Sequence, residues 1–161
     1  MTIEQLNSLP REQFVEALGG IYEHSPWVAE HAWERRPFAS LGELQDVMMA
    51  AVEASSPGVR LTLLRAHPDL GARLQMSPAS TGEQAGAGLD QLTASEFERL
   101  RDLNLAYRAK FGFPFILAVK GATKAEIFAA LERRFGNAVD DEFREAMRQV
   151  HRIAGFRLGA P

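Results

Sequence analysis

The chain could do chemistry with its four histidines and its many carboxylates and arginines. It contains no cysteine. The lack of cysteine excludes disulfides, thiolate nucleophiles and metal sites built on sulfur. His24 lies beside a predicted helix start, His31 near a helix end and His151 on a polar helix face, so we expect surface or packing roles for these three. No spacing typical of a metal site joins them, and we expect no metal.

His67 differs because it stands where a predicted helix must end. Pro68 disfavours the helical conformation for the residue before it, so the chain breaks at His67. An imidazole with an ordinary pKa of about 6.5 suits proton transfer near neutral pH, and Asp69 lies close by. Alternatively, His67 and Asp69 only end a helix and begin a turn. The spacing leaves both interpretations open.

A second candidate site is the stretch from Ser80 to Gln84. The spacing of Ser80 and Glu83 is typical of a helix start, which is the structural interpretation. The small residues 85–88 follow, and a tract without bulky side chains lets a ligand come close. Glu83 and Gln84 would then offer an acceptor and an amide donor to a small polar heterocycle.

Two further stretches allow both a structural and a functional interpretation. The aromatic residues from Phe111 to Phe115 are either core residues around a turn, or a rigid turn whose following backbone binds a ureido or lactam edge. Arg157, placed beyond the last predicted helix, is either a solvated charge near the terminus or a clamp for a carboxylate.

The elements that must position these groups are mostly helical. Apolar residues recur at helical spacing between capping and stop signals such as Thr93 with Glu96, Thr123 with Glu126, Ser40 with Glu43, and Gly155. The predicted helices cover residues 10–18, 27–35, 40–54, 59–66, 93–111, 123–135 and 139–154. Between them, residues 67–92 form a long connection rich in Gly, Ser, Ala and Pro, either functional or mobile, with 72–90 as a candidate lid.

The segment 113–119 is apolar but has no second strand with which to pair. We therefore predict an all-α fold with a single compact domain over residues 1–161, seven or eight helices, and one buried irregular segment. The backbone groups of such a segment need hydrogen-bond partners.

Composition limits the partners of the chain. Its 161 residues carry 18 basic and 21 acidic groups, a net charge of −3, so no basic surface is expected to bind nucleic acid. The longest apolar run is too short to span a bilayer, and neither a secretory signal nor a peroxisomal tripeptide is evident. We expect no membrane association and a cytoplasmic protein.

Taken in order along nearly the whole chain, several stretches resemble the 2-oxo-4-hydroxy-4-carboxy-5-ureidoimidazoline (OHCU) decarboxylase family. They are Ser25 to Val28, Arg36 to Phe38, His67 to Leu70, Ser80 with Glu83 and Gln84, Gly86 to Leu89, Asn104 with Tyr107 and Arg108, Phe111 to Phe115, and Arg157 with Leu158. Two features depart from the family: a shorter connection from Asp69 to Ser80, and Gly71 where alanine is common.

The resemblance implies a cofactor-free carboxy-lyase of urate catabolism that forms (S)-allantoin and CO₂, with an all-α fold and a homodimeric assembly. It implies catalytic roles for His67, the general acid/base, and for Glu83 and Arg157. It implies substrate contacts from Pro68, Ser80, Glu83 and Gln84, and from the backbone of Phe115, Ile116, Leu117, Ala118 and Val119.

Two other functions compete with this one. A non-catalytic α-helical module that binds a ureide or a protein groove would explain the aromatic turn but gives no task to His67. A neighbouring ureide enzyme, such as the hydrolase that precedes the decarboxylase, is the third possibility.

Overall fold

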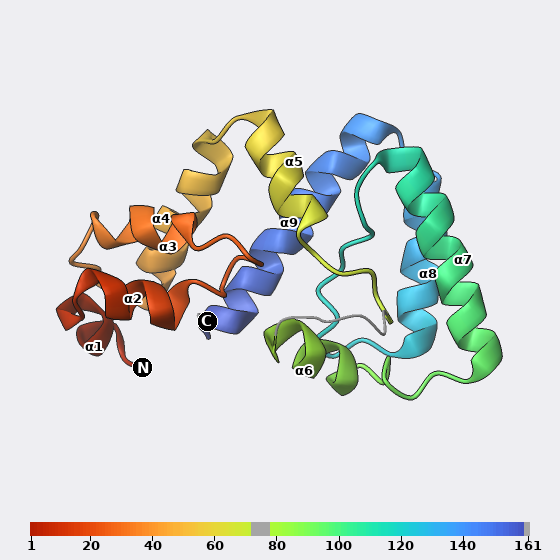
Figure 1. The fold of residues 1–161 in the computed structure, drawn as a ribbon, viewed down its shortest axis with the longest axis horizontal. Helices are drawn as coiled ribbons and strands as arrows, with labels where there is room; N and C mark the ends of the chain where they lie inside the picture. Colours follow the sequence, from red (N-terminus) through yellow and green to blue (C-terminus); the bar gives the residue numbers. More distant parts are fainter. Residues whose placement is uncertain (72–77, 160–161) are drawn as a thin grey trace. The chain divides into compact units, whose positions relative to one another are not determined.

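Helices make up the regular structure of the described chain (Figure 1). The computed structural model describes residues 1–71 and 78–159, without the side chains of Pro78 and Ser80. Within these ranges the nine helices are α1 (Ile3–Ser8), α2 (Arg11–Leu18), α3 (Trp27–Trp33), α4 (Leu41–Ala54), α5 (Pro57–Arg65), α6 (Pro78–Gly86), α7 (Ala94–Phe111), α8 (Lys124–Phe135) and α9 (Val139–Leu158). Since the described ranges contain no strand, the predicted all-α class is confirmed, with more helices than the seven or eight expected.

α1 was not among the predicted helices, and α6 was predicted only as one of the two interpretations of the Ser80–Glu83 spacing. α1 is only six residues long and buries one side chain, Leu6, so it shows no apolar period in the sequence. Its start is nevertheless marked by a full capping box between Thr2 and Gln5. α6 interrupts the long connection predicted over residues 67–92. Residues 72–77 of that connection lie outside the described residues, and so does this part of the predicted lid.

The helix starts are mostly those that the sequence predicts. Thr93 and Glu96 exchange both hydrogen bonds of a capping box, and the hydroxyl of Thr123 accepts from the backbone N–H of Glu126. Ser40 accepts from the N–H of Glu43 in the same way, but the Glu43 carboxylate accepts from Ala39. Only half of the predicted box therefore forms at α4.

The end of α9 was predicted wrongly. Gly155 was expected to stop this helix, but α9 continues through it to Leu158. Gly155 is buried, and a Cβ there would lie 2.7 Å from Nε2 of Gln45, so its lack of a side chain allows the close approach of Gln45. The helix ends before Gly159, whose φ of 75° is the left-handed conformation that favours glycine.

The chain divides into two compact units. Unit 1 comprises residues 1–66 and those from 151 onward, and unit 2 comprises residues 67–150. α9 contributes its first twelve residues, 139–150, to unit 2 and the rest to unit 1. Within the described ranges, no helix has the length and apolar character needed to cross a bilayer.

In unit 1, α3 packs against both α2 and α4. The core is built from the apolar faces that the helical period predicts. Its fully buried members include Phe14, Tyr22, Val28, Leu44, Met48, Val52 and Leu64.

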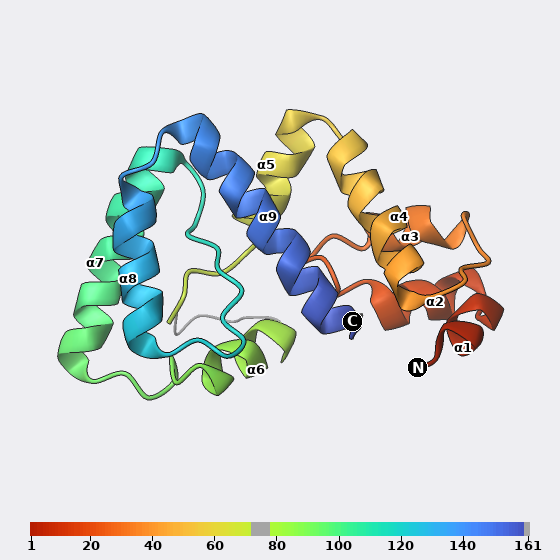
Figure 2. The same cartoon turned by 180° about the vertical axis from the view of Figure 1, so that it is seen from behind.

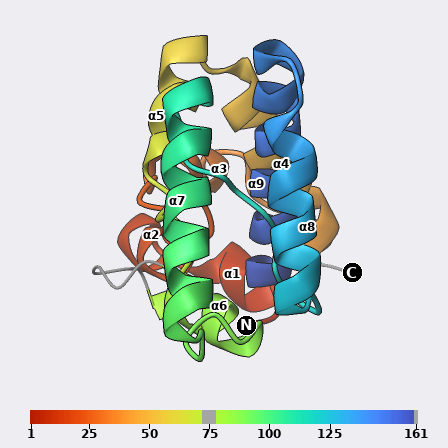
Figure 3. The same ribbon diagram turned by 90° about the vertical axis from the view of Figure 1, so that its right-hand side faces the viewer.

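In unit 2, α7 and α8 lie side by side (Figure 2). The connection between them crosses back from the end of α7 to the start of α8 (Figure 3), and it carries the predicted irregular segment 113–119. Tyr107 stands at the centre of an aromatic cluster, with ring centroids 4.5 Å from Phe111, 6.0 Å from Phe113 and 5.4 Å from Phe115. The aromatic side chains of this turn are core residues, while the predicted binding of a ligand by the following backbone stays a prediction.

Candidate active site

His67 lies two residues beyond the last residue of α5, directly after the helix cap Ala66. α5 begins at the capping hydroxyl of Ser56, and the chain leaves the helix before Pro68, as predicted. The imidazole is buried, with 6% of its surface exposed, while Pro68 is half-buried. A buried histidine held at a helix exit is shielded from water but still has a defined direction, which suits a group that moves a proton.

The residues that follow His67 are fastened to α7. Asn104 donates through Nδ2 to the carbonyl of Leu70 at 2.9 Å, and Arg108 forms an ion pair with Asp69 at 3.1 Å. Asn104 and Arg108 are four residues apart and therefore share one face of the helix. The ion pair with Arg108 anchors Asp69, two residues after His67, to α7.

A second fastening comes from α6. The backbone N–H of Gly71 donates to Oε1 of Gln84 at 2.8 Å, and both groups are buried. Gly71 has a φ of 73°, and a Cβ there would lie 2.6 Å from Cδ2 of Leu100. The glycine that departs from the family pattern is thus the residue that this conformation requires.

α6 carries three of the predicted site residues. The helix begins at Pro78, so Ser80 lies inside its first turn and is not the capping residue that the Ser80–Glu83 spacing predicted. Glu83 is half-buried and Gln84 is buried. Through the hydrogen bond that Gly71 donates to Gln84, the structure brings α6 and the residues after His67 together within unit 2.

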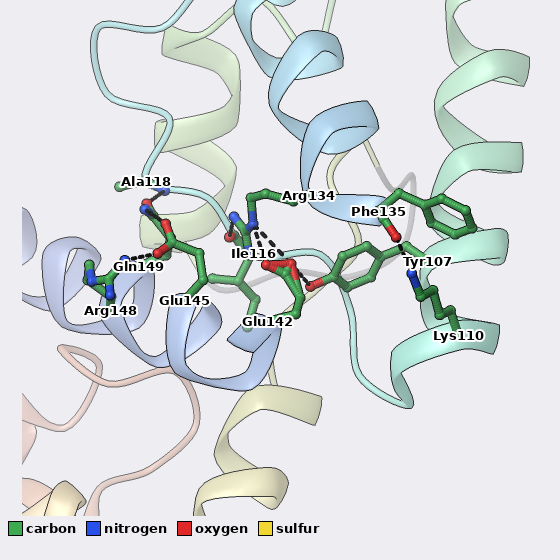
Figure 4. A network of polar contacts seen from close by, with 10 residues as sticks. All are labelled: Tyr107, Lys110, Ile116, Ala118, Arg134, Phe135, Glu142, Glu145, Arg148 and Gln149. Atoms are coloured by element: carbon green, nitrogen blue, oxygen red, sulfur yellow. Dashed lines mark hydrogen bonds and ion pairs between the residues drawn. The ribbon is translucent and has the colours of Figure 1, made fainter. Parts of the chain in front are cut away.

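The segment from Phe115 to Val119 is buried except at Leu117, which is half-buried. Figure 4 shows two side chains that form hydrogen bonds with its backbone. Nη1 of Arg134 donates to the carbonyl of Ile116 at 2.6 Å, and the N–H of Ala118 donates to Oε1 of Gln149 at 3.0 Å. The partners that this buried segment was expected to need are therefore side chains of α8 and α9.

Arg134 also belongs to a buried charge network (Figure 4). Its Nε lies 2.8 and 3.1 Å from the two carboxylate oxygens of Glu142, which in turn accepts from the Tyr107 hydroxyl at 3.0 Å. Burial raises the pKa of Tyr107 above its usual range; the Arg134 charge lowers it and the Glu142 charge raises it. This network ties α7, α8 and α9 together beneath the segment.

Two predictions for Arg157 were wrong: it does not lie beyond the last helix, and it is not a solvated charge. It lies in the last turn of α9, and its side chain is only 6% exposed. Nη2 lies 2.7 Å from Oε2 of the fully buried Glu23, and Nη1 donates to the carbonyl of Gly20 at 3.1 Å. It also lines a cavity of about 280 Å³ in unit 1. Because Arg157 belongs to unit 1, its convergence with His67 stays a prediction.

His151 was expected on a polar helix face, but it is buried. Its Nε2 donates to the Glu53 carboxylate at 2.7 Å, and its Nδ1 lies 2.8 Å from the Tyr22 hydroxyl. Burial, and then the Glu53 charge, raise the pKa of Tyr22 above its usual range. His151 is thus a packing group of unit 1, while His24 and His31 are exposed as expected. Within the described ranges, no group of three or more potential metal ligands is present.

Sequence reasoning gave no role to four residues that hold the candidate site: Glu23, Asn104, Arg134 and Gln149. For the last three a signal was available. Each is a polar residue at a position that the helical period assigns to the core, as Asn104 is between Leu100 and Tyr107. A polar group on an apolar face must find a buried partner. Glu23 lies outside any helix and carries no such signal.

Comparison with known proteins identifies relatives of this chain. A sequence model of the family described as OHCU decarboxylase matches residues 7–159. The 2-oxo-4-hydroxy-4-carboxy-5-ureidoimidazoline decarboxylase of Haloferax volcanii is 51% identical over 158 residues, which is 98% of this chain and 94% of the relative. A crystal structure of (S)-allantoin synthase superimposes with a TM-score of 0.82 at 40% identity, covering 99% of this chain and 54% of that one. A crystal structure of OHCU decarboxylase in the presence of (S)-allantoin has the same fold, with a TM-score of 0.71 at 23% identity over 92% and 95% of the two chains.

Proposed function

The chain belongs to the OHCU decarboxylase family, and from this premise we propose how its residues carry out the reaction. It is a carboxy-lyase of urate degradation that converts OHCU to (S)-allantoin and CO₂. The proposal concerns the task of each side chain in that conversion.

The substrate itself explains why a small helical protein suffices. Breaking the bond to CO₂ leaves an electron pair on the ring carbon that carried the carboxylate. The conjugated imine of the OHCU ring accepts this pair, so the protein needs no separate electron sink. What remains for the protein is to orient the carboxylate, exclude water and deliver a proton to one face of the ring.

His67 is the proton carrier in this proposal. It takes or gives a proton at the reacting carbon or its hydroxyl, as a general acid/base. The observation that carries the proposal is the fastening of the chain directly after the buried His67: Asn104 holds Leu70 and Gln84 holds Gly71. A general acid/base needs such a fixed direction, because proton transfer requires a heavy-atom approach of about 2.6–3.2 Å.

The ring and the ureido group are bound by α6 and by the segment from Phe115 to Val119. Glu83 accepts from substrate N–H groups, and Gln84 contributes its amide nitrogen, since its oxygen is engaged with Gly71. Ser80 and Pro68 complete the contacts. The backbone of the segment supplies paired donors and acceptors of the kind that match an amide edge.

Arg157 binds the departing carboxylate, because a guanidinium can bind a carboxylate with two parallel hydrogen bonds. In this proposal it holds the carboxylate roughly perpendicular to the ring. Glu23 supports this role, since its carboxylate lies 2.7 Å from Nη2 and holds the guanidinium in place. We expect the active form to be a homodimer in the cytoplasm.

The experiment that tests the function supplies the purified protein with the product of urate oxidase and follows allantoin by its optical rotation. We expect optically active (S)-allantoin to form faster than in the spontaneous reaction. A ureide-binding module would leave the rate unchanged. A preceding hydrolase would speed the loss of the urate oxidase product, but the allantoin formed would be racemic.

A further inference from the structure

The backbone of the segment from Phe115 to Val119 forms hydrogen bonds with side chains, where a strand would pair with a neighbouring strand. It lies between α7 and α8 and is neither helical nor part of a sheet, and four of its five residues are buried. In the part of the chain that the structure describes, no strand is available to pair with it. Buried backbone groups without partners are costly, so each amide of this segment must be accounted for.

Side chains account for one edge of the segment. The carbonyl of Ile116 accepts from Arg134, and the N–H of Ala118 donates to Gln149 (Figure 4). In an extended chain the backbone groups of alternate residues point to the same edge. The groups of residues 116 and 118 therefore share the edge that faces α8 and α9, while the N–H and C=O of Leu117 point to the other edge.

The opposite edge is the one open to a ligand. Neither the N–H nor the C=O of Leu117 forms a hydrogen bond with any described residue. Leu117 is also the one residue of the five that is not buried. Its adjacent donor and acceptor match the amide edge of a ureide, as paired strands match each other.

The orientation of the Gln149 amide is fixed from a second side. Its Nε2 donates to Oε1 of Glu145, one turn earlier on α9, at 3.0 Å (Figure 4). A carboxylate only accepts hydrogen bonds, so the amide must present its nitrogen to Glu145 and its oxygen to Ala118. Glu145 is itself held in an ion pair with Arg148.

We propose that Gln149 is a positioning residue for the decarboxylation: by holding the N–H of Ala118 it sets the register in which Leu117 presents its backbone to the substrate. This inference rests on the proposed function, in which the segment binds OHCU. Gln149 does not itself touch the substrate. It acts through the segment, so its loss weakens substrate binding more than the chemical step.

Gln149 is a better test than Arg134, because Arg134 also neutralises the buried Glu142 and its removal would leave that charge unpaired. Gln149→Leu removes the acceptor of Ala118 and the donor to Glu145 without leaving a buried charge unpaired. We expect KM for OHCU, made in situ from urate, to rise about tenfold while kcat falls less than about threefold. The affinity for (S)-allantoin, measured by calorimetry, should fall by the same factor as KM rises.

Two variants separate positioning from a general loss of stability. The swap Glu145→Gln/Gln149→Glu reverses the pair but still offers an oxygen to Ala118, and should restore KM to within about threefold of the wild type. Asn7→Leu is the matched control, because Asn7 also bonds a backbone through its amide, at the N–H and C=O of Phe38, in a region without a proposed substrate contact. It should lower the melting temperature but leave KM unchanged.

An unchanged KM and allantoin affinity in a folded Gln149→Leu protein would overturn the proposal. If that variant does not fold, the wild type decides by NMR: (S)-allantoin should shift the amide resonance of Leu117 more than that of Ala118, and the reverse order would overturn it. If His67→Ala abolishes turnover while Gln149→Leu changes nothing, the inference about Gln149 fails and the proposed function stands.

Discussion

At the scale of single residues, the buried pair of Arg157 and Glu23 shows how the proposed site depends on charges held away from water. Glu23 is fully buried and Arg157 nearly so, and their charged atoms lie 2.7 Å apart. A buried ion pair is a weak source of stability compared with apolar packing, but breaking it leaves one unpaired charge in the interior. Variants at Arg157 therefore affect both the fold and the reaction.

This coupling is measurable in a double-mutant cycle. Glu23→Gln and Arg157→Met should each lower the free energy of unfolding by about 3 kcal/mol, because each leaves the other charge unpaired. The double variant should lose about 1–3 kcal/mol less than the sum of the two, measured by chemical denaturation.

The exposed pair of Arg11 and Glu30 in the same unit is the matched control. Arg11→Met should cost less than about 1 kcal/mol, since exposed ion pairs contribute little. Strictly additive effects of the Glu23 and Arg157 variants would show that the two side chains do not stabilise each other.

The residues that could be found from the sequence are those with a local signature. His67 is marked by Pro68, and the structure confirms the helix exit there. The partners that hold the chain after His67 are distant in sequence: Gln84 lies 13 residues from Gly71, and Asn104 lies 34 residues from Leu70. Local spacing carries no information on such contacts, because they depend on how α6 and α7 pack.

At the scale of elements, capping signals located most helix starts, and the errors have physical causes. Gly155 carries the same local signal as a helix stop, but in the structure it is a buried helical glycine that makes room for Gln45. The true stop, Gly159, lies four residues further on. Single-sequence patterns do not distinguish a glycine required for close packing from one required for a left-handed turn.

The cap of α7 gives a pH-dependent prediction. The backbone hydrogen bond from Thr93, followed by the hydrogen bond from Lys124, lowers the pKa of Glu96 below its usual value. A carboxyl group whose pKa is lower in the folded state stabilises the protein at neutral pH, and this contribution is lost as the pH falls through the lowered pKa. Glu96→Gln should therefore lower the melting temperature at neutral pH, and the difference from wild type should shrink as the pH falls below the ordinary glutamate pKa of about 4.3.

Glu126→Gln serves as the control for this measurement. Glu126 has the matching position in the cap of α8, but it pairs with no lysine among the described residues. Its replacement should change the melting temperature less. A difference between Glu96→Gln and wild type that stays constant over the acid range would contradict the role assigned to the charge.

At the scale of the whole molecule, the described chain comprises two compact units, each with its own buried core. The all-α class and the apolar faces were predictable, because both follow from helical periodicity. The single domain over residues 1–161 stays a prediction, as does the convergence of Arg157 with the residues of unit 2. Contacts between distant parts of a chain leave no periodic signal in one sequence.

Each unit contains one of the two tyrosines of the sequence, and both are buried. Burial is the main cause that raises the pKa of Tyr22 and of Tyr107. A group whose pKa is raised on folding contributes stability below its unfolded pKa, about 10 for tyrosine, and loses it as the pH rises further. Stability should therefore fall above about pH 10.

The ultraviolet absorbance of phenolate, followed beside the circular dichroism of the helices, checks this prediction. The two tyrosines should ionise only as the helical signal is lost. Phenolate that appears near pH 10 in a protein with intact helices would show that at least one tyrosine reaches water in the folded state.

The central claim is that His67 moves the proton in a stereospecific decarboxylation, and the turnover of His67→Ala tests it most directly. The rate of (S)-allantoin formation from OHCU should fall by about 10²–10⁴ in kcat, the usual contribution of a positioned acid or base. Circular dichroism and the affinity for (S)-allantoin should stay close to those of the wild type. A folded His67→Ala protein that forms (S)-allantoin at nearly the wild-type rate would contradict the claim.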